Sequence, residues 1–139
     1  MIGILLVTHG NIGKSLLNCA THILDSSPSS VDCLPINSNK NLENYSNIIS
    51  KKIKDLDTGH GVLIMTDIYG ATPCNLLNKF TKKNEVAVVT GVNLPMLIEA
   101  ISERKDNLNV IVKDSMDCAM RNIKKIWFPN DQKKDKNYK

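Results

Sequence analysis

Short apolar runs recur along the chain and alternate with segments of helical periodicity. They are rich in Val, Ile and Leu, are bounded by glycine or polar residues, and cover residues 2–7, 31–36, 61–67, 86–90 and 108–112. Runs of this length predict five β-strands. Because consecutive positions are apolar, both faces of the sheet should be buried, which indicates a mostly parallel sheet between two layers of helices.

The segments between the runs carry apolar residues at the three- and four-residue spacing of an amphipathic helix. We expect one helix over residues 16–24, a second over 42–56, a third from about Pro73, a fourth from about Leu94 and a fifth over 116–127. Strand and helix alternate five times, which is typical of an open α/β sandwich. Such folds bind ligands beyond the carboxyl ends of their strands.

The 139 residues, of which 42% are hydrophobic, suit a single domain. We expect that domain over residues 1–128, followed by a disordered polar tail over residues 129–139. The tail holds four Lys and two Asp and so accounts for +2 of the net charge of +4. Basic residues do not alternate with aromatic ones in a stripe, so nucleic-acid binding is not expected.

Four cysteines are scattered without a CxxC pair, so neither a zinc site nor a redox dithiol is predicted. No apolar stretch approaches the roughly eighteen residues that a membrane span requires. The first apolar run is too short for a signal peptide, and no positively charged segment precedes it. We therefore expect a cytoplasmic protein that is not inserted into a membrane.

Three segments follow predicted strand ends: residues 8–10, 67–73 and 90–95. His9, at the end of the first run, is the most informative histidine. A neutral imidazole can accept a phosphoryl group when its second nitrogen is held in the right tautomer. Asp67 is the natural partner if the first and third strands are neighbours. Helix capping by His9 and turn capping by Asp67 remain open alternatives.

Thr72 and Pro73 together predict a helix start, with Thr72 as the N-cap. The backbone N–H groups near Gly70, Ala71 and Thr72, with the Thr72 hydroxyl, would suit a phosphoryl group on His9. Simple capping is again an alternative. The third segment, residues 90–95, reads on its own as a turn followed by a helix start.

These three segments, in this order, resemble the signatures of the mannose-type enzyme IIA domain of the bacterial sugar phosphotransferase system. The resemblance extends over residues 1 to about 127. It rests on Thr8-His9-Gly10, on Asp67-Ile68-Tyr69-Gly70-Ala71-Thr72-Pro73-Cys74-Asn75 and on Thr90-Gly91-Val92-Asn93-Leu94-Pro95-Met96-Leu97. The chain has Ala71-Thr72 where the family usually has Gly-Ser, and the threonine keeps the hydroxyl.

The resemblance implies that His9 receives phosphate from the histidine-containing phosphocarrier protein and passes it to an enzyme IIB partner on a separate chain. It implies that Asp67 orients the ring, that Thr72 contacts the phosphoryl oxygens, and that no metal or cofactor takes part. It also implies a homodimer in which the strand at residues 108–112 is antiparallel at the sheet edge and joins the subunit contact. The fold expected is thus a three-layer α/β sandwich around five strands.

Two other phosphate chemistries fit the sequence poorly. The segment from Gly10 to Ser15 lacks the first glycine of a nucleotide-binding P-loop, because Thr8 stands at that position. A histidine phosphatase would need an arginine there to clamp phosphate. Two other uses of a phosphorylated His9 remain open: a regulatory phosphoprotein without sugar transport, and a phosphate donor to a dihydroxyacetone kinase.

Overall fold

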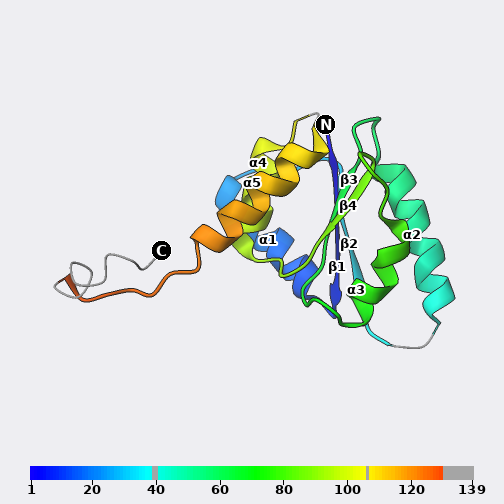
Figure 1. Ribbon diagram of the computed structural model, residues 1–139, viewed down its shortest axis with the longest axis horizontal. Coiled ribbons are helices and arrows are strands. Elements are labelled where there is room, and N and C mark those ends of the chain that lie inside the picture. Colours follow the sequence, from blue (N-terminus) through cyan, green and yellow to red (C-terminus); the bar gives the residue numbers. More distant parts are fainter. Residues whose placement is uncertain (39–40, 106, 130–139) are drawn as a thin grey trace.

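A four-stranded parallel sheet lies between two layers of helices in the computed structural model, which describes residues 1–38, 41–105 and 107–129 (Figure 1). The strands are β1 (Gly3–His9), β2 (Val31–Ile36), β3 (Val62–Met65) and β4 (Val86–Val89). The helices are α1 (Ile12–Leu24), α2 (Leu42–Leu56), α3 (Thr72–Leu77), α4 (Leu94–Glu103) and α5 (Leu108–Arg121), with a short 3₁₀ turn, η1 (Asn78–Phe80), after α3.

The strand order β2-β1-β3-β4 makes β1 and β3 neighbours at the centre of the sheet. The chain runs from β1 outward to β2 and then returns to the other side of β1 as β3. Helices α1, α4 and α5 cover one face, and α2 and α3 cover the other (Figure 1). The direction of winding therefore changes between β1 and β3, which is where open α/β sheets bind ligands.

Strand β1 alternates its side chains between two apolar cores. Ile4 and Leu6 pack into the core beneath α1, α4 and α5, whereas Leu5 and Val7 pack into the core beneath α2. All four are fully buried, and each such side chain stabilises the fold by about 1.5–3 kcal/mol. The prediction of a sheet buried on both faces is confirmed.

The predicted fifth strand is wrong. Residues 108–112 form the first turns of α5, so the sheet formed by the described residues has four strands, all parallel, and no antiparallel edge strand. The side chain of Asn107 accepts a hydrogen bond from the Val110 N–H at 3.2 Å and caps this helix. Leu108, Ile111 and Ala119 are buried at helical spacing. A run of five apolar residues fits either structure, and the cap and packing against α4 favour the helix.

Two other helix ends differ from the sequence predictions. Helix α5 ends at Arg121, so residues 123–128 continue beyond it without helical structure. Helix α3 begins at Thr72, which makes Ala71 the N-cap residue in place of Thr72. Apart from Pro129, the predicted polar tail lies outside the described residues.

Candidate functional site

His9 is the last residue of β1, at the point where the sheet changes its winding direction. Gly10 follows with φ of +47°, a left-handed conformation that glycine adopts easily and that turns the chain toward α1. The buried part of β1 ends one residue earlier, and 44% of the His9 side chain is exposed. The imidazole is thus carried by a rigid strand but remains accessible to another molecule.

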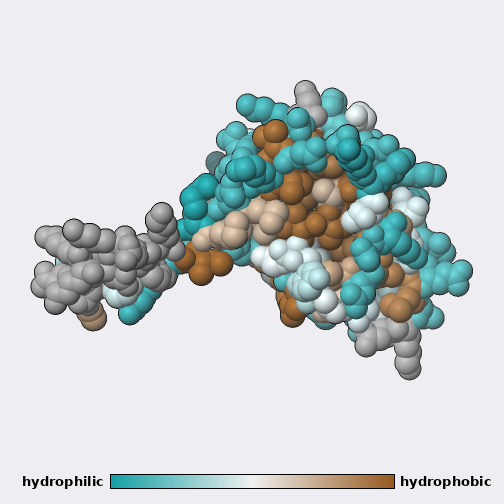
Figure 2. All heavy atoms as spheres, in the orientation of Figure 1, coloured by the Kyte–Doolittle hydropathy of each residue, from teal (hydrophilic) through white to brown (hydrophobic). Residues whose placement is uncertain are grey.

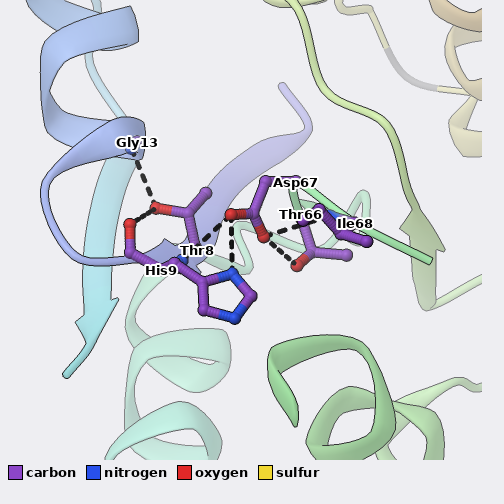
Figure 3. Close-up of polar contacts among 6 residues, drawn as sticks. All are labelled: Thr8, His9, Gly13, Thr66, Asp67 and Ile68. Carbon is purple, nitrogen blue, oxygen red and sulfur yellow. Dashed lines mark hydrogen bonds and ion pairs between the residues drawn. The ribbon is translucent and has the colours of Figure 1, made fainter. Parts of the chain in front are cut away.

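Asp67 lies beside the His9 ring, two residues beyond the end of β3 (Figure 3). Its Oδ2 atom is 2.8 Å from the ring Nδ1 and also accepts the His9 backbone N–H at 3.2 Å. An ionised carboxylate can only accept, so Nδ1 carries the proton in this contact. In the neutral ring the lone pair is then on Nε2, which Figure 3 shows on the side of the ring away from Asp67.

The Asp67 carboxylate is itself well supplied with donors. Its second oxygen, Oδ1, accepts the Ile68 N–H at 3.1 Å and the Thr66 hydroxyl at 3.4 Å. Burial by itself would raise the pKa of this carboxyl, but the hydrogen bonds from the His9 ring and backbone outweigh it, and the pKa lies below its ordinary value. Asp67 is therefore ionised at neutral pH and can stabilise positive charge on the imidazole.

Sequence reasoning missed two buried hydroxyl groups, each one residue before a member of the pair. Thr8 precedes His9, and Thr66 precedes Asp67; both are buried at the strand ends. The Thr8 hydroxyl accepts the Gly13 N–H at 2.9 Å and donates to the His9 carbonyl at 3.3 Å. A polar residue directly after an uninterrupted apolar run was the available signal.

Gly70, Ala71 and Thr72 form the turn that leads from Asp67 into α3. The carbonyl of Gly70, which has φ of +80°, accepts a hydrogen bond from the Asn75 side chain at 3.1 Å. Thr72 lines a hollow of about 530 Å³ between α2 and α3. In the described part of the chain no hydrogen bond joins Thr72 to His9.

Residues 90–95, which follow β4, hold the end of the neighbouring strand β3 in place next to residues 67–73. The Val92 N–H donates to the Thr66 carbonyl at 3.0 Å, beneath Asp67. The Asn93 side chain accepts the Met96 N–H at 2.9 Å, capping α4, and donates to the Ala119 carbonyl of α5 at 3.3 Å. This segment thus joins the strand ends to the helices, and none of these contacts involves His9.

The described residues contain no group of three or more His, Cys, Asp or Glu side chains that could hold a metal ion. The cysteines are unpaired, and burial, together with the charge of Asp32, raises the pKa of the Cys33 thiol to about 11. That thiol is protonated at neutral pH and is a poor nucleophile. The strongest nucleophile with an oriented partner is Nε2 of His9.

Comparison with known proteins shows the family of the chain. The family model EIIA-man, described as the PTS system fructose IIA component, matches residues 3–116. The chain belongs to this family. The mannose-specific EIIAB component of the phosphotransferase system (PTS) of Escherichia coli strain K12 is 31% identical over 109 residues. That match covers 76% of this IIA chain but only 33% of the relative, so the chain spans about a third of its length.

Other IIA proteins match over nearly their whole length. The fructose-specific EIIA component of Bacillus subtilis is 23% identical, with 97% of this chain and 98% of that protein covered. The mannose/sorbose-specific IIA subunit of Enterococcus faecalis has the same fold, with a TM-score of 0.79 at 21% identity over 92% and 96% of the two chains. The IIA protein of the Streptococcus pneumoniae fucose utilization operon has a TM-score of 0.70 at 28% identity, over 94% of each chain.

None of the described helices of this IIA chain is long and apolar enough to cross a bilayer.

Proposed function

We propose that His9 is the phosphoryl acceptor of this IIA chain. The observation that carries the proposal is the 2.8 Å contact between Nδ1 of His9 and Oδ2 of Asp67, which places the lone pair of the neutral ring on Nε2, in a side chain that is 44% exposed. The donor is the histidine-containing phosphocarrier protein, and the acceptor of the next step is an enzyme IIB. Both encounters take place in the cytoplasm and require no metal or cofactor.

The transfer is a displacement at phosphorus. The Nε2 lone pair of His9 forms the new N–P bond, while the N–P bond of the donor breaks and its electron pair returns to the donor nitrogen. The Nδ1 proton stays between the ring and Asp67, whose negative charge stabilises the positive ring. In the second transfer a nucleophile of enzyme IIB attacks phosphorus, and Nε2 leaves with the electron pair.

Donors for the phosphoryl oxygens come, in this proposal, from the turn that follows Asp67. Gly70 and Ala71 offer backbone N–H groups, and Thr72 offers both its N–H and its hydroxyl. Charged oxygens favour fixed N–H donors of this kind because the donors need no reorganisation when charge arrives. The lack of a contact between Thr72 and His9 is compatible with a phosphoryl group bridging them.

The test is incubation with phosphoenolpyruvate, enzyme I and the phosphocarrier protein, followed by intact-mass measurement. We expect a gain of one phosphate that is labile in acid and stable in base. His9→Ala should abolish the gain and keep the fold, whereas His22→Ala, which alters an exposed histidine on α1, should behave as wild type. An unmodified wild-type chain in the presence of an active donor would contradict the proposal.

The phosphorylated chain then distinguishes transport from regulation. Mixed with enzyme IIB, it should lose its phosphate to that partner. A stable phosphohistidine that enzyme IIB cannot discharge would instead favour a regulatory phosphoprotein or a donor to a dihydroxyacetone kinase.

We also propose that the chain is a homodimer joined through α5 and the segment that follows it. Met116 and Met120 are exposed four residues apart on α5, and in the segment that follows Ile123, Ile126 and Phe128 are 67%, 94% and 78% exposed. Figure 2 shows hydrophobic residues gathered in the middle of one face and at the root of the C-terminal segment. Apolar surface of this extent is typical of a protein interface.

The oligomeric state tests the dimer. Light scattering coupled to size exclusion should report a dimer for the wild type and a monomer for Ile126→Asp combined with Phe128→Asp. Ile23→Asp, which places one aspartate at an exposed apolar position of α1, is the control and should remain a dimer. A monomeric wild type at tens of micromolar would remove the dimer from the proposal.

We propose that the unit that carries these properties extends over residues 1–128. A chain truncated after Phe128 should be phosphorylated at the wild-type rate. A lower rate would give the tail a part in partner binding.

A further inference from the structure

Thr8 occupies a position where β1, α1 and His9 meet. Its side chain is buried, although it lies at the end of the strand, next to an exposed histidine. The hydroxyl accepts the Gly13 N–H at 2.9 Å and donates to the His9 carbonyl oxygen at 3.3 Å, and both contacts are drawn in Figure 3. One hydroxyl therefore connects the helix to the backbone of the histidine.

The contact with Gly13 takes the place of an ordinary helix cap. The first turn of any helix has N–H groups without partners inside the helix. Asn11 is the N-cap residue of α1, but its side chain accepts no capping hydrogen bond. The Gly13 N–H is instead satisfied by Thr8, five residues earlier and on the preceding strand.

The absence of a side chain at Gly13 permits this approach. A Cβ atom there would lie 3.1 Å from Cβ of Leu6 and 3.2 Å from the Thr8 hydroxyl oxygen. Both distances are shorter than ordinary van der Waals contact, so a side chain would push α1 away from the strand. Glycine in the first turn thus brings the helix close enough for the hydrogen bond.

His9 pairs with Ile36 of β2, and the Gly10 N–H donates to the Ile36 carbonyl at 3.3 Å. The His9 side chain itself is nearly half exposed, and the strand ends at Gly10, which has a left-handed φ of +47°. On one side Asp67 accepts both the backbone N–H and Nδ1–H of His9. On the other side, only the Thr8 hydroxyl among the described hydrogen bonds fixes the His9 carbonyl through a side chain.

We propose that Thr8 is a positioning residue: through Gly13 it ties α1 to the backbone of His9 and thereby keeps the ring in register with Asp67. The role of His9 as phosphoryl acceptor, on which the effect on transfer rests, is the function proposed above. Without the hydroxyl, the Gly10 turn can rotate, and Nδ1 loses its fixed alignment with Oδ2 of Asp67. Nε2 then carries the lone pair in only part of the population.

Thr8→Val is the direct test, because it removes the hydroxyl and keeps the shape. We expect the single-turnover rate of phosphoryl uptake to fall by about 10–100-fold, the range seen when a group that orients a reactive histidine is lost. The concentration of phosphocarrier protein that gives half the maximal rate should not change. Thr8→Ser restores the hydroxyl and should recover most of the rate.

A second readout needs no phosphate donor. In nitrogen-15 NMR of the unphosphorylated wild type, the His9 resonances should be those of a single tautomer with the proton on Nδ1. In Thr8→Val the two ring resonances should move toward each other as the tautomers mix. The NMR result stands even if His9 proves not to accept phosphate, so failure of this inference and failure of the proposed function can be told apart.

Gly13→Ala perturbs the same link from the helix side and keeps the Thr8 hydroxyl, so it replaces Thr8→Val if that variant does not fold. Ser115→Ala is the control, because it removes a buried hydroxyl that has no partner among the described residues, on α5. The inference is overturned if Thr8→Val and Gly13→Ala retain both the wild-type rate and the wild-type resonances. It is overturned equally if Thr8→Ser is as slow as Thr8→Val, or if Ser115→Ala is equally impaired.

Discussion

At the scale of single residues, the reactivity of the site depends on how one carboxylate distributes its hydrogen bonds. Oδ2 of Asp67 serves the ring and the backbone of His9, and Oδ1 is occupied by Thr66 and Ile68. The carboxylate therefore has no freedom to turn away from the imidazole. The tautomer of His9 follows from the donors around Asp67 as much as from His9 itself.

Asp67→Asn should slow phosphoryl uptake without abolishing it. The amide can still contact the ring, but it carries no charge to stabilise the imidazole once phosphate is attached. We expect a loss of about 10–100-fold in the single-turnover rate, measured by rapid quench with the phosphorylated carrier protein. Wild-type kinetics in this variant would exclude Asp67 from the reaction.

The pH dependence of stability offers a separate test of the same pair. The pKa of Asp67 in the folded protein lies below its ordinary value of 3.8, so the folded state binds fewer protons than the unfolded state. The stabilisation is therefore present above pH 3.8 and is lost as the pH falls through the folded pKa. Urea unfolding between pH 6 and pH 3 should show the free-energy difference between wild type and Asp67→Asn shrinking on acidification. A difference that stayed constant would show that the hydrogen bonds do not favour the ionised form.

At the scale of elements, α4 and α5 are held together at one end by Asn93. Its side-chain oxygen accepts the Met96 N–H and so caps α4, and its side-chain NH₂ group donates to the Ala119 carbonyl in the last turn of α5. The turn that contains Asn93 is also joined to the end of β3, because the Val92 N–H donates to the carbonyl of Thr66, the residue that follows β3. Residues 90–95, which the sequence alone predicts to be a turn and a helix start, thus connect α4 and α5 with the strand that leads to Asp67.

Asn93→Ala should destabilise the fold by about 1–2 kcal/mol, since it removes a helix cap and a second hydrogen bond. Urea denaturation followed by circular dichroism measures this change. Asn107→Ala, which removes the cap of α5 without a second partner, is the comparison and should cost less. Equal losses would mean that the contact with Ala119 contributes nothing.

At the scale of the whole molecule, the buried guanidinium of Arg104 joins parts of the chain far apart in sequence. It donates to the carbonyl oxygens of Ile2 and Ser30 at 3.2 Å and 3.1 Å, and also to that of Ser29. These groups lie at the starts of β1 and β2, at the opposite end of the sheet from His9. Arg104 therefore holds the starts of the strands together at one end of the sheet, and the exposed His9 side chain lies at the other end.

Arg104→Met should lower the free energy of unfolding by about 2–4 kcal/mol, because carbonyl groups that accepted from a charged donor lose their partner. Phosphoryl uptake at 20 °C should be unchanged, since the site lies at the far end of the sheet. Denaturation and the uptake assay together test this separation. A fall in the uptake rate of a fully folded variant would mean that the two ends are coupled.

Much of this molecule could be predicted from local sequence. The apolar run at 2–7 indicated a strand buried on both faces, and the strand ends directed attention to His9 and Asp67. These signals are local because side-chain periodicity and turn chemistry act within a few residues.

Tertiary structure alone decided three matters. Residues 108–112 became a helix because Asn107 caps it and α4 packs on it, which periodicity over five residues cannot reveal. The partner of His9 Nδ1 lies 58 residues away, and its contact depends on the pairing of β1 with β3. The hydroxyl of Thr8 reaches Gly13 only because the turn at Gly10 brings α1 back onto the strand. The sequence offered Asp67 as a candidate partner of His9, but only the pairing of β1 with β3 placed the two side chains together. The packing of α4 on α5 and the contact of Thr8 with Gly13 likewise depend on how the chain folds back on itself.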